Sequence, residues 1–144
     1  MPAGVLADAD AVAVALAWLQ NHERLAAEVG GISGIVESPW PRIVVSSGAG
    51  GDLGDLRWNI RQEVQLEVLG DPDGRPGKAA LWRIAMLAVS ALAELQDRDD
   101  VPPGVPVVSG VDANGAVVWS PLANGQHRWV ISVYLTLHPP QVMP

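Results

Sequence analysis

Two segments of the chain alternate apolar and polar residues, and this alternation constrains the fold more than any other feature. In residues 60–69, Val64, Leu66 and Val68 share one face of an extended strand, and polar residues occupy the other. In residues 128–137, five apolar side chains starting at Trp129 alternate in the same way. A strand with one apolar and one polar face is typical of an antiparallel sheet that is covered on one side.

Two further stretches have the apolar spacing of helices and can cover that sheet. Residues 8–29 begin with Asp8 and Asp10, where carboxylates cap free N–H groups, and end at Gly30-Gly31. Residues 78–97 are expected to form a second helix. Their apolar seam consists of Leu81, Ala85, Ala88, Leu92 and Leu95.

The remaining segments predict short strands separated by turns. Residues 42–47 are β-branched, and a glycine-rich loop is expected at 48–55. Residues 105–111 carry Pro106, which suits an edge strand, and Asn114-Gly115 predicts a hairpin turn before a brief strand at 117–120. The sequence therefore predicts a single α+β domain over 1–144. It has two layers, with two main helices on one face of a mostly antiparallel (mixed) sheet of about four to five strands.

Residue types that carry catalysis or bind metals are scattered. The absence of cysteine excludes disulfides and thiolate chemistry. His22, His127 and His138 lack metal-ligand spacing, so we expect them at the surface. The glycines at 48–50 begin like a dinucleotide fingerprint, but a strand follows them instead of a phosphate-binding helix. No Gly-x-Ser-x-Gly elbow occurs, and we predict no enzyme, cofactor or metal site.

The charge of the chain argues against DNA recognition, and its apolar segments argue against a membrane. Nine basic and sixteen acidic residues give a net charge of −7, whereas DNA-binding proteins usually present a basic patch. The apolar residues 11–20 lack a preceding basic region and are shorter than the roughly 20 residues that span a bilayer. We expect neither specific nucleic-acid binding nor membrane association.

Six tryptophans are the most informative side chains for function. Three lie within predicted elements and are expected in the core: Trp18, Trp82 and Trp129. The other three stand at junctions between loops and strands: Trp40, Trp58 and Trp119. These three either pack beneath loops or serve as interface anchors, because tryptophan is enriched at interaction hot spots.

A series of short motifs follows the predicted elements along most of the chain. They are Trp40-Pro41-Arg42-Ile43-Val44-Val45, Asp55-Leu56-Arg57-Trp58, Val64-Gln65-Leu66-Glu67-Val68-Leu69-Gly70, Lys78-Ala79, Trp119-Ser120-Pro121 and Gly125-Gln126-His127-Arg128-Trp129-Val130. In order and spacing they resemble the tail terminator proteins of long-tailed bacteriophages (siphophages), particularly those that infect actinobacteria. The segment 141–144 has no assigned counterpart.

The resemblance implies a structural virion protein that makes and breaks no covalent bond. Such subunits close into a homo-oligomeric ring, a hexamer by this resemblance, on the last ring of the tail tube and stop tube polymerisation. The other face of the ring meets head–tail stopper or connector proteins, and DNA passes through without specific binding. The expected location is the tail–neck junction of the virion, after assembly in the host cytoplasm.

Several residues are expected to make the contacts of such a ring. The expected interface residues are Trp40, Gly50, Asp52, Asp55, Trp58, Asp71, Asp73, Arg75 and Trp119. The acidic members Asp52, Asp55, Asp71 and Asp73 are expected to face the lumen, where negative charge repels DNA. Strand 105–111 offers an edge that can pair with a neighbouring sheet.

Two alternatives remain open at this stage. The first is another neck component, such as a head–tail stopper or a tail-completion protein. The second is a small ligand-binding or enzymatic α+β domain that uses a cleft beside residues 48–55. Such folds host many functions, so fold alone does not separate these alternatives.

Overall fold

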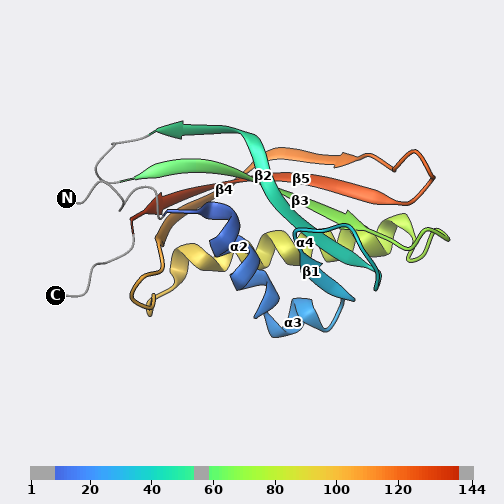
Figure 1. Ribbon diagram of the computed structural model, residues 1–144, viewed down its shortest axis with the longest axis horizontal. Helices are drawn as coiled ribbons and strands as arrows, with labels where there is room; N and C mark the ends of the chain where they lie inside the picture. Colours follow the sequence, from blue (N-terminus) through green and yellow to red (C-terminus); the bar gives the residue numbers. More distant parts are fainter. Residues whose placement is uncertain (1–8, 54–58, 140–144) are drawn as a thin grey trace.

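The computed structural model of the protein describes residues 9–53 and 59–139, except for the side chains of 49–53 and 113–116. The helices are α2 (Ala11–Gln20), α3 (Glu23–Ala26), α4 (Lys78–Ala93) and the 3-10 helix η1 (Glu94–Asp97). The strands are β1 (Gly31–Ser33), β2 (Arg42–Leu53), β3 (Ile60–Leu69), β4 (Val107–Trp119) and β5 (Arg128–His138). Figure 1 shows two layers, with the sheet above and α2, α3 and α4 below it.

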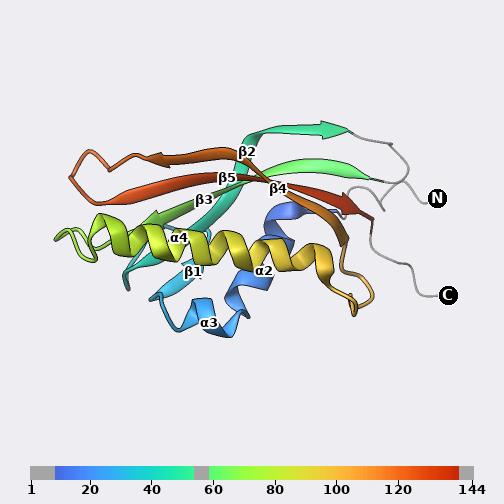
Figure 2. The ribbon, with the colours of Figure 1, turned by 180° about the vertical axis from the view of Figure 1, so that it is seen from behind.

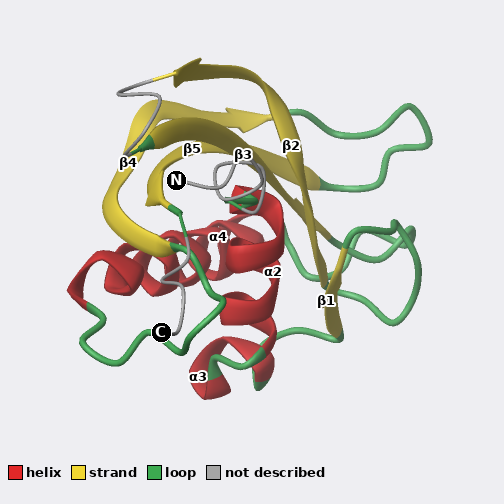
Figure 3. Cartoon of the chain, turned by 60° about the vertical axis from the view of Figure 1, so that its left-hand side comes forward, coloured by secondary structure: helices red, strands yellow, loops and turns green. Residues whose placement is uncertain are grey.

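The sheet is mixed and mostly antiparallel, as predicted. Its strand order is β1-β2-β3-β5-β4, and only the pairing of β1 with β2 is parallel among the described strands. β3 and β5 pair along their length, from Ile60 opposite Leu137 to Leu69 opposite Arg128. Figure 3 shows the helices gathered on one side of the curved sheet, which confirms the predicted two-layer α+β fold.

The core forms between that sheet and the helices α2 and α4, and Figure 2 shows α4 running along the sheet. The whole predicted seam of α4 and η1 is buried, and so are Val64, Leu66 and Val68 of β3. Burial of a large apolar side chain contributes about 1.5–3 kcal/mol, so this interface dominates stability. Lys78–Asp97 has the length and composition of a membrane-crossing helix, but its apolar seam packs inside the domain.

The predicted helix over residues 8–29 is wrong in its second half. Asp10 caps α2 as expected, because its carboxylate accepts a hydrogen bond from the Ala13 N–H at 3.2 Å. The helix ends at Gln20, where the Asn21 side chain donates back to the Ala17 carbonyl at 2.8 Å. The ring of His22 then caps the separate helix α3. Local side-chain bonds to the backbone therefore split one apolar stretch into two helices.

Two predicted turns are bulges within longer strands. The loop expected at 48–55 is strand as far as Leu53, and the pairing of β2 with β3 shifts register between Ser47 and Gly51. The hairpin expected at Asn114-Gly115 is likewise part of β4, which shifts register between Ala113 and Val117. Glycines in a strand mark such bulges as readily as they mark turns.

Candidate functional site

A row of tryptophans lies where the β4–β5 hairpin meets the start of α4. Trp119 and Trp129 face each other across the two strands, and their ring centroids are 5.0 Å apart. Trp82 of α4 contacts Trp129 at the same centroid distance, with an interplanar angle of 64°. Both contacts are edge-to-face, the arrangement that aromatic quadrupoles favour. We call Trp82, Trp119 and Trp129 the aromatic row.

Lys78, the first residue of α4, ties the helix to this row. Its ammonium group lies 4.9 Å from the ring centroid of Trp119 and 5.5 Å from that of Trp129. Its carbonyl accepts a hydrogen bond from Nε1 of Trp129 at 3.1 Å. A cation over indole rings is electrostatically favourable, so Lys78 adds a positive charge beside the aromatic row.

The aromatic row is partly open to solvent, which corrects part of the prediction. Trp82 is 41% exposed, whereas a core position was expected. It directly follows the buried seam residue Leu81, and adjacent helical residues point about 100° apart, so Trp82 faces away from the core. Trp18 and Trp129 pack against the core but are only partly buried. The Trp18 Nε1 donates to the Ala91 carbonyl at 2.6 Å.

The turn between β3 and α4 is held against the β4–β5 hairpin. The buried Gln126 side chain donates to the Gly70 carbonyl at 2.6 Å, and the Gly70 N–H donates to the His127 carbonyl at 3.0 Å. Within the turn, an Asp71 carboxylate oxygen accepts from the Asp73 N–H at 2.6 Å. These bonds fix the turn beside the aromatic row.

Four of the predicted interface residues lie around His127. The Trp119 ring centroid is 5.2 Å from that of His127, and the turn that carries Asp71, Asp73 and Arg75 packs against the same ring at Gly74. Trp40 lies just before β2, whose first residue Arg42 pairs with Leu69, so it belongs to the same end of the sheet. Two others stand at the opposite end, where Asp52 pairs with Arg61 at the start of β3, and Gly50 lies in the adjacent bulge. Asp55 and Trp58 fall outside the described residues.

The predicted lumen acids therefore do not form one cluster among the described residues. Asp52 lies beside one end of β3, and Asp71 and Asp73 follow its other end. A ten-residue strand is about 30 Å long, so the two groups are separated by nearly the length of the sheet.

A second charged surface, which the sequence did not single out as functional, lies at the far end of α4. Four exposed carboxylates gather within seven residues there: Glu94, Asp97, Asp99 and Asp100. We call them the acidic end. Arg98 lies among them, but its guanidinium lies 5.2 Å from the Trp18 ring centroid and is only partly exposed.

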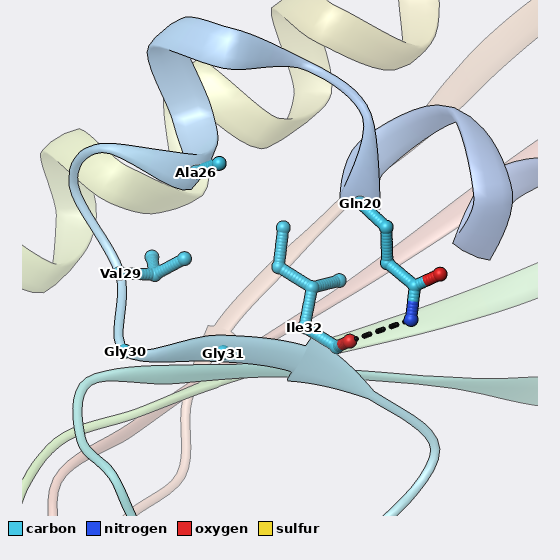
Figure 4. A pocket seen from close by; sticks show the side chains of 6 residues that line it. All are labelled: Gln20, Ala26, Val29, Gly30, Gly31 and Ile32. Carbon is cyan, nitrogen blue, oxygen red and sulfur yellow. Dashed lines mark hydrogen bonds between the residues drawn. The ribbon is translucent and has the colours of Figure 1, made fainter.

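The pocket beside β1 does not resemble a catalytic site. It encloses about 210 Å³ and is lined by Gln20, Ala26, Val29, Gly30, Gly31 and Ile32. Figure 4 shows its one polar side chain, Gln20, donating to the Ile32 carbonyl at 2.9 Å. Across the described part of the chain, no three His, Asp or Glu side chains are placed to hold a metal ion. The lining offers no acid, base or nucleophile.

Comparison with known proteins identifies the fold but no family. No protein-family model and no curated protein matches the chain. Among solved structures, the chain is similar to one in the virion of a native gene transfer agent particle, with a TM-score of 0.64 and 16% identity. The match covers 92% of this chain and 97% of that chain. The two chains share one fold along nearly their whole lengths.

Proposed function

We propose that this protein is a structural virion protein that caps the end of a phage tail tube as a ring. The observation that carries the proposal is the match over 92% of the chain to a chain of a virion particle. The tail-terminator motifs of the sequence point to the same class of protein. In this role the ring stops tube polymerisation and provides the surface that joins the tube to the head or neck.

The surface of the domain suits assembly better than catalysis. Its exposed tryptophan and the cation beside it are the kind of residues that anchor interfaces. A ring of identical copies needs two different, complementary patches on each copy, and its contacts close when the rotation permits. The proposed partners are further copies of this chain, the tail tube protein and a stopper or connector protein.

The negative charge of the chain fits a passage through which DNA slides. Asp52, Asp55, Asp71 and Asp73 are proposed to face that passage, where carboxylates repel phosphates. Reversing the charges of Asp52, Asp55 and Asp73 is expected to leave ring assembly intact and to slow DNA passage during infection. Asp71 is left unchanged because its carboxylate holds the β3–α4 turn. Normal infectivity of phage carrying this variant would contradict the lumen assignment.

Polymerisation of tail tube protein in the presence of this chain tests the proposed function. We expect added protein to bind one tube end, to stop growth and to shorten the tubes in electron micrographs. The control is the same concentration of this protein after irreversible heat denaturation. Binding to head-connector rings but not to tube ends would identify a head–tail stopper instead. Unchanged tube lengths with no end binding would contradict a terminator.

A further inference from the structure

The charges at the two ends of α4 are the reverse of those that stabilise a helix. The helix dipole favours acids in the first turn and bases in the last. Here the first turn has no acid and begins with Lys78, whereas the last turn has no base and continues into Glu94 and Asp97. This placement costs stability in the isolated subunit, so the charges call for another explanation.

The charged groups at both ends are also available to a partner. Lys78 and Arg75 are exposed and form no ion pair with any described residue. The same holds for Asp97, Asp99 and Asp100 within the described ranges. Glu94 contacts the His22 ring at 3.2 Å but its side chain remains 57% exposed. Asp71 and Asp73 lie near the basic end, where Asp71 is engaged in its own turn.

Each end of the helix also carries a partly apolar surface. At the basic end, Trp82 projects from α4 beside exposed residues of the first helical turn. Next to the acidic end lies a groove of about 310 Å³, which is lined by Val14, Ala17, Trp18, Asn21, Arg98 and Val105. One end therefore carries a partly exposed indole near a cation, and the other carries a groove near carboxylates that Arg98 also lines. Aromatic residues of this kind often anchor interfaces.

We propose that the aromatic row and Lys78 of one copy dock onto the acidic end and Trp18 groove of a second copy. The two ends of α4, to which these patches belong, lie far apart along the long axis of the molecule in Figures 1 and 2. A contact between two different patches repeats from copy to copy, and it closes into a ring when the rotation between neighbouring copies permits. We assign the partner as a second copy of this chain because each copy carries both the positive patch and the negative patch. This inference rests on the proposed ring.

Charge exchange between the two ends tests the contact. Two variants are compared: one carries Lys78→Glu, and the other carries both Asp99→Lys and Asp100→Lys. We expect each variant to lower the ring population about tenfold or more at physiological salt, because like charges then meet at the contact. The protein carrying all three substitutions is expected to recover rings, because attraction returns with opposite sign. Sedimentation velocity measures the populations. Trp82→Ala is expected to weaken rings, and Asp112→Lys, on the opposite face of the sheet, serves as the matched control.

Loss of rings in Lys78→Glu is not expected to come from unfolding, because an acid at a helix start is favourable. Circular dichroism of each variant verifies this. Undisturbed rings in Lys78→Glu would overturn the contact while leaving the ring itself intact. Intact rings that no longer bind tail tubes would assign the aromatic row to the tube instead. A wild-type protein that self-associates neither alone nor on tube ends would overturn both the contact and the proposed function.

Discussion

Replacing Asp97 by lysine is expected to make the single subunit more stable while weakening its assembly. Asp97 ends η1, which continues α4, so its carboxylate lies against the negative end of the helix dipole. A surface charge near a helix end is worth about 0.3–1 kcal/mol, and the substitution removes a repulsion and adds an attraction. The two contributions sum to about 0.6–2 kcal/mol. Because Asp97 is exposed and solvent screens its charge, we expect a gain at the low end, about 0.6–1 kcal/mol in the free energy of unfolding.

This gain corresponds to a measurable shift in the thermal midpoint. Unfolding entropies of about 2.1 cal/mol/K per residue give about 0.3 kcal/mol/K for 144 residues. Asp97→Lys is thus expected to raise Tm by about 2–3 °C in calorimetry at protein concentrations where the subunit is monomeric. Asp112→Lys, a charge reversal in β4, is the control: it has no helix end to act on and loses its contact with Arg61 at 4.0 Å, so it is not expected to raise Tm.

The salt dependence of the shift tests its cause. The Debye length falls from about 30 Å at 0.01 M salt to about 3 Å at 1 M, so the gain should shrink strongly over this range. A fall in Tm, or a gain that high salt leaves unchanged, would refute the dipole argument. Sedimentation of the same variant should show fewer rings, because one acidic group of the proposed contact has changed sign.

Three further substitutions test the packing that positions the aromatic row and the sheet. Gln126→Ala removes a buried hydrogen bond between the hairpin and the β3–α4 turn and should cost about 1–3 kcal/mol in urea unfolding. Leu92→Ala opens a cavity beneath α4 and should cost about 2–5 kcal/mol in the same assay. Gly30→Ala places a methyl group 2.9 Å from backbone atoms of Pro39 and should cost about 1–3 kcal/mol. Gly77→Ala, with open space around it, should be tolerated.

The elements that could be predicted from the sequence are those in which buried apolar residues repeat at the spacing of a helix or a strand. The alternation around Val64 and the seam from Leu81 to Leu95 each repeat over several turns or pleats, so the buried face was evident without long-range information. The bulges at Gly48–Gly51 and Asn114-Gly115 were predicted as turns because the same glycines serve both structures. Only the pairing of neighbouring strands decides between them.

The candidate surface could be predicted only in part for the same reason. Trp119 and Arg75 were expected at an interface from their places beside turns. The contact of Trp82 with Trp129 depends on how α4 crosses β5, which no local pattern reveals. The residues of the acidic end are evident as charges in the sequence. That they and Lys78 stand at opposite ends of one helical segment becomes clear only from the fold.

The mass of the assembled protein tests the proposed ring most directly. It is measured by light scattering with and without tail tubes, and the tube ends are then imaged by electron microscopy. Six copies of the 15.2-kDa chain correspond to about 91 kDa, and we expect that mass in solution or a ring-shaped cap at one tube end. A subunit that remains a monomer near 15.2 kDa and leaves tube ends bare would contradict the proposed function.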